Sequence, residues 1–194
     1  MATIGPVSEP NSLPPVDEAY GIFCGAVNEE TVKKLAACLS TATTKNQNVH
    51  LLFQSSGGSV GDGVFLYNFF KSLPVRLTIY NVGSVSSIAV IAYLGAKRRV
   101  TSAHAVFMIH RTNLKSQGGL PLTVMKGITK SLSLDDERSE NILKDRIILP
   151  VGQEWSDLDD YDFYFSGKEA VDIGLADEIG EFAPPLGTPV YYFS

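Results

Sequence analysis

Residues 49–59 read VHLLFQSSGGS, and this stretch decides the fold. Its first part, Val49–Phe53, is almost continuously apolar, which is typical of a strand buried on both faces of a parallel sheet. The run ends in a turn that contains two adjacent glycines. Apolar residues then recur at helical spacing from Leu66 to Leu73, and the pattern stops at Pro74. The stretch therefore predicts a strand, a tight turn and a helix.

Further strands and helices alternate on both sides of this unit. A helix is expected after Asn28, a capping residue followed by two acids, and another over about Ser86–Leu94. The additional strands are expected at Ile22–Ala26, Val75–Val82, Arg99–Ser102 and Ala105–Ile109. Short alternation of strands and helices is the mark of right-handed βαβ units, so the sequence predicts an α/β fold.

The length of 194 residues fits one domain with a substantial core. Residues 1–19, which include four prolines, predict an extended N-terminal arm, and residues 20–194 predict a single domain. Residues from about 120 to 149 predict a helix on the order of 40 Å long. Such a helix is longer than a domain of this size can cover on its own surface, so part of it should project and pack on another subunit.

The composition excludes several classes of function. Sixteen Lys and Arg against 21 Asp and Glu give a charge of −5, so no positive field exists to hold a nucleic acid. The two cysteines, Cys24 and Cys38, form neither a disulfide framework nor a metal-ligand pattern, and no metal or cofactor is implied. Because no targeting signal is visible, we expect a reducing, cytoplasmic location. The uncharged stretch Leu77–Ala96 favours a strand and a buried helix over a membrane span.

Three features could carry chemistry. Ser87 stands at the start of a predicted helix, where it is either a cap or a nucleophile next to N–H groups that stabilise an oxyanion. His110 ends an apolar strand, where a histidine is often structural. Gly57 and Gly58 form a turn or let the backbone approach a ligand closely. Loops after successive parallel strands meet at one sheet edge, so these residues can converge as the parts of a serine hydrolase.

Four motifs place these residues in a wider pattern. They are GGSV at 57–60, GSVSS at 83–87, MIH at 108–110 and SGKEAVDIGLAD at 166–177. In order and spacing they resemble the proteolytic subunit of the Clp protease, over roughly residues 20–180. The resemblance implies a ClpP/crotonase-like spiral of ββα units, with the long helix at about 120–149 as a protruding handle. It also implies a homo-oligomer of rings or stacked rings that encloses a chamber for peptide or unfolded protein substrates.

The resemblance also implies a role for each matching position. Ser87 matches the nucleophile and His110 the general base. The backbone N–H groups of Gly57 and Ile88 match the oxyanion hole. The segment that would pair with an extended substrate consists of Gly58, Ser59 and Val60.

The acid of the triad is displaced from the expected position. Counting back without gaps from the motif at Ser166 puts the aspartate of the family on Leu158. Asp157, Asp159 and Asp160 flank this position, so a slip of one residue would restore the triad, and Asp159 is our choice. Loss of the acid should lower the rate by about 10⁴-fold.

The sequence thus predicts a serine endopeptidase that hydrolyses unfolded or short peptides by an acyl-enzyme mechanism inside an oligomeric chamber. The alternative is a ClpP-like structural subunit that is weak or inactive because its triad is incomplete. A crotonase-type enzyme acting on acyl-coenzyme A is a third hypothesis, but the sequence holds no recognisable coenzyme A site. The short segment before the first strand weighs against a Clp-type ATPase partner.

Overall fold

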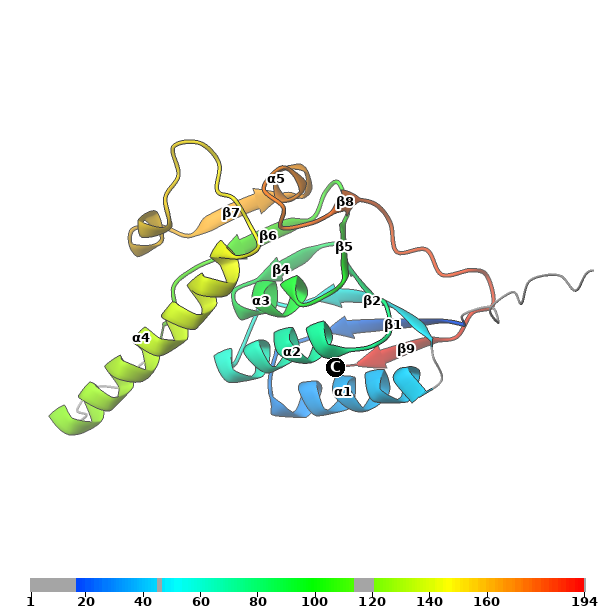
Figure 1. Ribbon diagram of the computed structural model, residues 1–194, viewed down its shortest axis with the longest axis horizontal. Coiled ribbons are helices and arrows are strands. Elements are labelled where there is room, and N and C mark those ends of the chain that lie inside the picture. The colour runs from blue at the N-terminus through cyan, green and yellow to red at the C-terminus, as the bar shows by residue number, and fades with distance from the viewer. Residues whose placement is uncertain (1–16, 45–46, 114–120, 194) are drawn as a thin grey trace, which may run out of the picture.

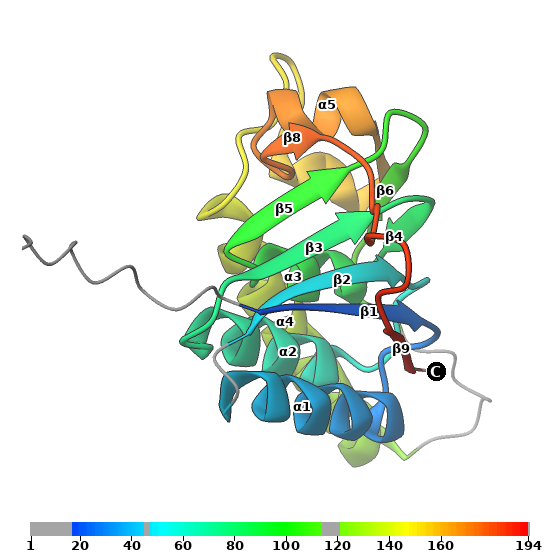
Figure 2. The same cartoon turned by 90° about the vertical axis from the view of Figure 1, so that its right-hand side faces the viewer.

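The computed structural model describes residues 17–44, 47–113 and 121–193. Within these residues, six strands form one sheet in the order β8-β5-β3-β2-β1-β9, and all neighbouring strands are parallel. Helices α1, α2 and α3 lie on one face of this sheet (Figures 1 and 2). The prediction of an α/β fold is therefore confirmed.

The element bounds follow the chain order. The strands of the large sheet are β1 (Glu18–Cys24), β2 (Asn48–Gln54), β3 (Leu77–Asn81), β5 (Arg98–Thr101), β8 (Glu178–Ile179) and β9 (Val190–Phe193). The helices are α1 (Glu29–Thr44), α2 (Val60–Ser72), α3 (Ile88–Leu94), α4 (Leu122–Lys144), the 3-10 helix η1 (Trp155–Asp159) and α5 (Gly167–Asp172).

The core lies between the large sheet and its helices. Leu35 of α1 and Phe70 of α2 are fully buried. Below them, the rings of Phe23 in β1 and Phe53 in β2 stack with their centroids 4.8 Å apart. All five residues of β3 are buried, whereas β2 alternates between buried and half-buried residues. The helices thus cover β2 on one face only, and its apolar run is buried less completely than the sequence predicts.

A second, smaller sheet joins the first at the carboxyl ends of its strands. It consists of β4 (Ser84–Ser86), β6 (Val106–Ile109) and β7 (Phe163–Ser166) in that order. β4 and β6 are parallel, and β6 and β7 are antiparallel. A parallel bridge between Ser55 and Val85 connects the end of β2 to β4. This bridge brings the glycine turn after β2 next to the start of α3.

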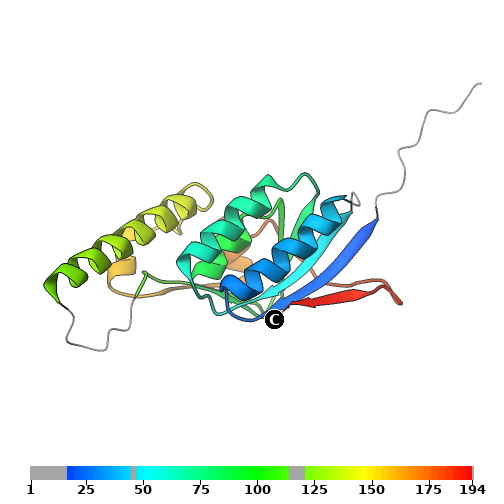
Figure 3. The ribbon, with the colours of Figure 1, turned by 90° about the horizontal axis from the view of Figure 1, so that it is seen from below.

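Helix α4 extends away from the body of the molecule (Figures 1 and 3). It has 23 residues instead of the predicted 30 or so, which corresponds to about 35 Å. Leu143 near its end is buried against the core, whereas Leu122 and Met125 in its first turn are more than half exposed. The projecting half of the predicted handle therefore carries apolar side chains that the described residues do not cover.

Several boundaries differ from the sequence-based prediction. The first strand begins at Glu18, inside the predicted arm of residues 1–19, whose residues 1–16 lie outside the described ones. The chain after Gly83 forms β4, so that α3 begins at Ile88 and not at Ser86. The sequence analysis missed β7, β8 and β9, because these short strands are specified by distant partners and not by local periodicity.

The uncharged stretch Leu77–Ala96 forms β3, β4 and α3, which confirms the expected strand and buried helix. In the described part of the chain, no helix has the length and apolar character needed to cross a membrane.

We predict that Gly63→Ala destabilises the fold. A Cβ on Gly63 of α2 would lie 2.3 Å from Cγ1 of Ile88 and 3.0 Å from its carbonyl oxygen, so α3 would have to move. Overpacking of this kind costs about 1–3 kcal/mol, which urea unfolding can measure. Gly61→Ala is the control, since its Cβ would meet Ser59 Oγ only at 3.9 Å. Equal stability of the two variants would contradict close packing of α2 on α3.

Candidate active site

Ser87 lies in the turn between β4 and α3, and its backbone is strained. Among the described non-glycine residues it alone has a positive φ, with φ 58° and ψ −135°. Its N–H donates to the carbonyl oxygen of Met108 at 2.7 Å, and its own carbonyl accepts from Val90 N–H at 3.0 Å. A non-glycine residue in this region costs about 1–3 kcal/mol, and such residues cluster at functional sites. The side chain is half-buried and makes no capping hydrogen bond, which disfavours a role as a helix cap.

The glycine turn after β2 packs directly against Ser87. A Cβ on Gly57 would lie 2.7 Å from Cβ and 3.1 Å from Oγ of Ser87. A Cβ on Gly58 would lie 2.1 Å from the carbonyl oxygen of Val27. Both glycines have φ between +100° and +155°, at 101° and 154°. No other residue type fits this close approach, which explains the adjacent pair in the sequence.

The two glycines direct their N–H groups differently. Gly57 N–H donates to Ser55 Oγ at 3.1 Å. Val27 pairs with the turn by donating its N–H to the Gly57 carbonyl at 2.9 Å and accepting from Ser59 N–H at 2.8 Å. In a parallel bridge with this pattern, the N–H and C=O of Gly58 point to the opposite edge. Gly58 lines the cavity, and its N–H is not used in the pairing with Val27, whereas the N–H of Ser59 is.

After Gly58 the chain enters helix α2, so Ser59 and Val60 do not form the extended segment that the sequence predicts. Ser59 is the N-cap of α2, and its hydroxyl accepts from Asp62 N–H at 3.4 Å. Val60 is the first residue of α2 and lines the cavity. The structure thus leaves Gly58 and Val60 at the cavity, and Ser59 in a capping role.

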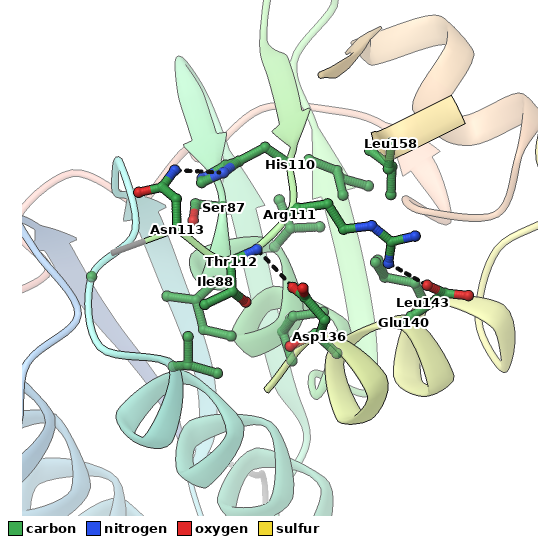
Figure 4. A pocket seen from close by; sticks show the side chains of 16 residues that line it. Ser87, Ile88, His110, Arg111, Thr112, Asn113, Asp136, Glu140, Leu143 and Leu158 are labelled. Atoms are coloured by element: carbon green, nitrogen blue, oxygen red, sulfur yellow. Dashed lines mark hydrogen bonds and ion pairs between the residues drawn. The ribbon is translucent and has the colours of Figure 1, made fainter. Parts of the chain in front are cut away.

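His110 follows β6 and lines the same cavity as Ser87 (Figure 4). Its Nδ1 lies 3.4 Å from Nδ2 of Asn113. The cavity has a volume of about 230 Å³. Apolar side chains from α3, α4 and η1 form part of its wall, including Ile91, Leu143 and Leu158. The structure brings Ser87, His110 and the glycine turn together at one edge of the sheet, as the sequence predicts.

The acids near residue 158 make other contacts. Asp159, which is 68% exposed, accepts from Arg111 Nε at 2.8 Å. Asp157 caps η1 by accepting from Glu154 N–H at 2.9 Å. Asp160 is exposed at the end of η1. Leu158 itself is buried and lines the cavity. The structure therefore brings Leu158 to the site, but it pairs Asp159 with Arg111 and not with His110.

The strand register identifies a further acid, Asp162, that the sequence analysis passed over. Strands β6 and β7 are antiparallel, and their last pair is Ile109 with Phe163. One step further, the same register puts His110 opposite Asp162, on the same face of the sheet. Asp162 lies four residues before Ser166. The ungapped count from Ser166 places the acid at residue 158, four residues before Asp162, and therefore misses Asp162. The pairing of β6 with β7 was the missing information, because it joins segments more than fifty residues apart.

Arg111, next to His110, connects three elements around the cavity. It forms an ion pair with Glu140 of α4 and donates to Asp159 of η1. Burial alone would lower the pKa of Arg111, but hydrogen bonds to these two carboxylates raise it further above its ordinary value. The guanidinium is therefore charged and held in place at any working pH.

A strained serine and a histidine thus line one cavity, with a glycine turn and the start of a helix against the serine, an arrangement typical of the class of serine hydrolases. Comparisons with known proteins then give the family. A profile described as Clp protease matches residues 16–182. The chain belongs to the Clp protease family, a family of serine peptidases, which confirms the resemblance seen in the motifs.

Two relatives and one solved structure illustrate the similarity. The chain is 26% identical over 169 residues to "ATP-dependent Clp protease proteolytic subunit 2" of Corynebacterium glutamicum, covering 81% of this chain and 80% of that protein. The protein of the same name from Corynebacterium diphtheriae is 25% identical over 173 residues, covering 84% and 82%. The structure of a ClpP1 mutant from Listeria monocytogenes aligns with a TM-score of 0.68 at 22% identity, over 84% of this chain and 91% of that chain. The last match confirms the ClpP-like fold.

We predict that Glu140 stabilises the fold in a pH-dependent way. Burial alone would raise the pKa of Glu140, but hydrogen bonds from Lys144 and Arg111 outweigh it and lower the pKa below its ordinary value of 4.5. Stabilisation from a lowered pKa is complete above that ordinary value and is lost as the pH falls through the folded-state pKa. Glu140→Gln should therefore cost about 1–3 kcal/mol at pH 7 and progressively less toward pH 3.

Urea unfolding of both proteins across this pH range measures the difference. Glu137→Gln, which changes an exposed carboxylate on the same helix, is the matched control. If the free energy of unfolding of Glu140→Gln differs from that of the unmodified chain by the same amount at every pH, the charge of Glu140 has no stabilising role.

Proposed function

We propose that the chain is a serine endopeptidase that hydrolyses unfolded or short peptides through an acyl-enzyme. The observation that carries the proposal is the strained backbone of Ser87 at the start of α3, in a cavity that His110 also lines. Fold and family agree with this chemistry. A capping role does not explain the strained backbone, because the Ser87 side chain makes no capping hydrogen bond to α3.

The reaction would proceed in two steps. Ser87 Oγ attacks the peptide carbonyl carbon while His110 Nε2 takes the hydroxyl proton; the C–N bond then breaks and the leaving amine receives that proton. Water next attacks the acyl-enzyme, again giving a proton to His110, and the proton returns to Ser87 as the acid product leaves. Each step passes through a tetrahedral oxyanion that needs two N–H donors.

Gly58 and Ile88 are our proposed oxyanion donors. The predicted donor Gly57 has its N–H engaged with Ser55, whereas the N–H of Gly58 is directed to the cavity edge. Ile88 is the first residue of α3, so its N–H has no partner within the helix. The backbone of Gly58 also suits pairing with an extended peptide, whose side chains would meet Val60 at the cavity wall.

Asp162 is our proposed acid, because its position across from His110 suits a carboxylate that accepts from Nδ1–H. That acceptor fixes the tautomer in which Nε2 is free to act as a base. Asp159 stays a prediction from the sequence, and its contact with Arg111 favours a structural role.

We predict that Asp162→Asn lowers kcat by about 10³- to 10⁴-fold, as in other triads that lose their acid. Asp159→Asn, a matched change three positions earlier at another exposed residue, should keep kcat within about 3-fold, because it removes only a solvent-exposed ion-pair partner of Arg111. Steady-state hydrolysis of a fluorogenic peptide measures both. If Asp159→Asn shows the larger loss, the acid is Asp159 and the register argument is wrong.

An inactive structural subunit is the second candidate function. The observation in its favour is that, among the described residues, the hydrogen-bond partner of His110 Nδ1 is the amide of Asn113, at 3.4 Å, and not a carboxylate. A donor at Nδ1 would place the imidazole proton on Nε2, the tautomer that cannot accept from Ser87. The third hypothesis, a crotonase-type acyl-coenzyme A enzyme, gains no support from the Clp protease match.

Assembly into rings and a cytoplasmic location complete the proposal. Members of this family form oligomeric rings, and the exposed apolar residues Leu122 and Met125 suit α4 for contact with another subunit. The expectation against a Clp-type ATPase partner stays a prediction, because it rests on residues 1–19, most of which lie outside the described ones.

We predict that Ser87→Ala abolishes peptide hydrolysis while fold and assembly stay intact. The hydroxyl is the nucleophile that forms the acyl-enzyme in the proposed mechanism, so kcat/KM should fall by at least about 10⁴-fold. Peptide hydrolysis is measured together with circular dichroism and light scattering, and Ser84→Ala is the control on the preceding strand. Hydrolysis retained by Ser87→Ala would exclude the mechanism; no hydrolysis by the unmodified chain in an intact ring would favour the structural subunit.

A further inference from the structure

Arg111 directly follows His110, but its side chain points away from the catalytic residues toward α4 (Figure 4). Its guanidinium is 27% exposed and Glu140, its partner on α4, is 20% exposed. The pair is therefore largely shielded from water, where an ion pair is screened less than at the surface. This makes it stronger than the exposed pairs elsewhere on α1 and α5.

The guanidinium of Arg111 binds two further groups besides Glu140. Its Nε donates to Asp159 Oδ1 at 2.8 Å, and its Nη2 donates to the carbonyl oxygen of Trp155 at 3.4 Å. Both groups belong to η1. A planar guanidinium can make such contacts in several fixed directions at once, which a lysine ammonium cannot. Arg111 thus joins the end of β6 to α4 and to η1.

The next residue adds a second attachment to α4. Thr112 N–H donates to Asp136 Oδ1 at 2.7 Å. Asp136 and Glu140 are four residues apart, so both carboxylates lie on the same face of the helix. The segment that follows His110 is therefore fixed to α4 at two points, one helical turn apart.

We infer that Arg111 is a positioning residue for the proposed reaction: by fixing the segment after His110 to α4 and η1, it holds the imidazole in line with Ser87. The inference rests on the proposed function. Reacting groups must be held within a fraction of an ångström, and a displacement of about 1 Å can cost about 10²-fold in rate. Because the guanidinium of Arg111 is held by α4 and η1 and is turned away from Ser87, its loss should change kcat and leave KM nearly constant.

Four variants test the inference by steady-state kinetics on the assembled protein. Arg111→Gln and Glu140→Gln should each lower kcat by about 10- to 100-fold, with KM within about 2-fold. The double variant should show no further loss, since both changes break one interaction. Arg111→Lys keeps the charge without the planar contacts, so its kcat should be intermediate. Arg138→Gln, which removes an ion pair with Asp135 within the same helix, is the control and should match the unmodified chain.

A second readout does not depend on activity. Hydrogen–deuterium exchange of the peptide that contains the Thr112 amide should become about 10-fold faster in Arg111→Gln and Glu140→Gln, but not in Arg138→Gln. Unchanged exchange, or a kcat of Arg111→Gln equal to that of Arg138→Gln, would overturn the positioning role. If the unmodified chain does not hydrolyse peptides, the proposed function fails, and the exchange rates still decide whether Arg111 fixes this segment.

Discussion

The backbone conformation of Ser87 is the constraint on which the site depends. A positive φ at a serine is unfavourable by itself, so it requires support from several sides. The bond from Ser87 N–H to Met108 comes from β6, the bond from Val90 comes from α3, and Gly57 closes the third side. These supports come from segments that are separated in sequence, and the fold is what brings them together.

The large parallel sheet provides this support through one connection. The bridge between Ser55 and Val85 is the point at which β2 of the large sheet meets β4 of the small one. It fixes the glycine turn against the turn that holds Ser87, while β6 carries His110 to the same edge. The helices add to this arrangement from one face, since Gly63 lets α2 lie close to Ile88, next to Ser87. Packing in the body of the fold thus determines the geometry at Ser87, the proposed nucleophile.

The sequence was sufficient for the parts of the site that local patterns specify. The apolar run Val49–Phe53, the glycine pair after it and the positions of Ser87 and His110 predicted a parallel sheet with a converging edge. The proposed acid, Asp162, could not be found in the same way, because its position opposite His110 depends on the pairing of β6 with β7. The proposal of Gly58 in place of Gly57 as an oxyanion donor also depends on a distant residue, since the pairing with Val27 leaves the N–H of Gly58 unused. Local periodicity carries no information about either pairing.

Labelling with a fluorophosphonate probe, followed by peptide mapping, tests the central claim most directly. Such probes react with serines that an adjacent base and an oxyanion hole activate, so the readout requires no knowledge of the substrate. We predict stoichiometric modification of Ser87 in the assembled protein, with labelling lost in His110→Ala. An unlabelled Ser87 in a folded assembly would contradict an activated nucleophile and would identify the chain as a structural member of its family.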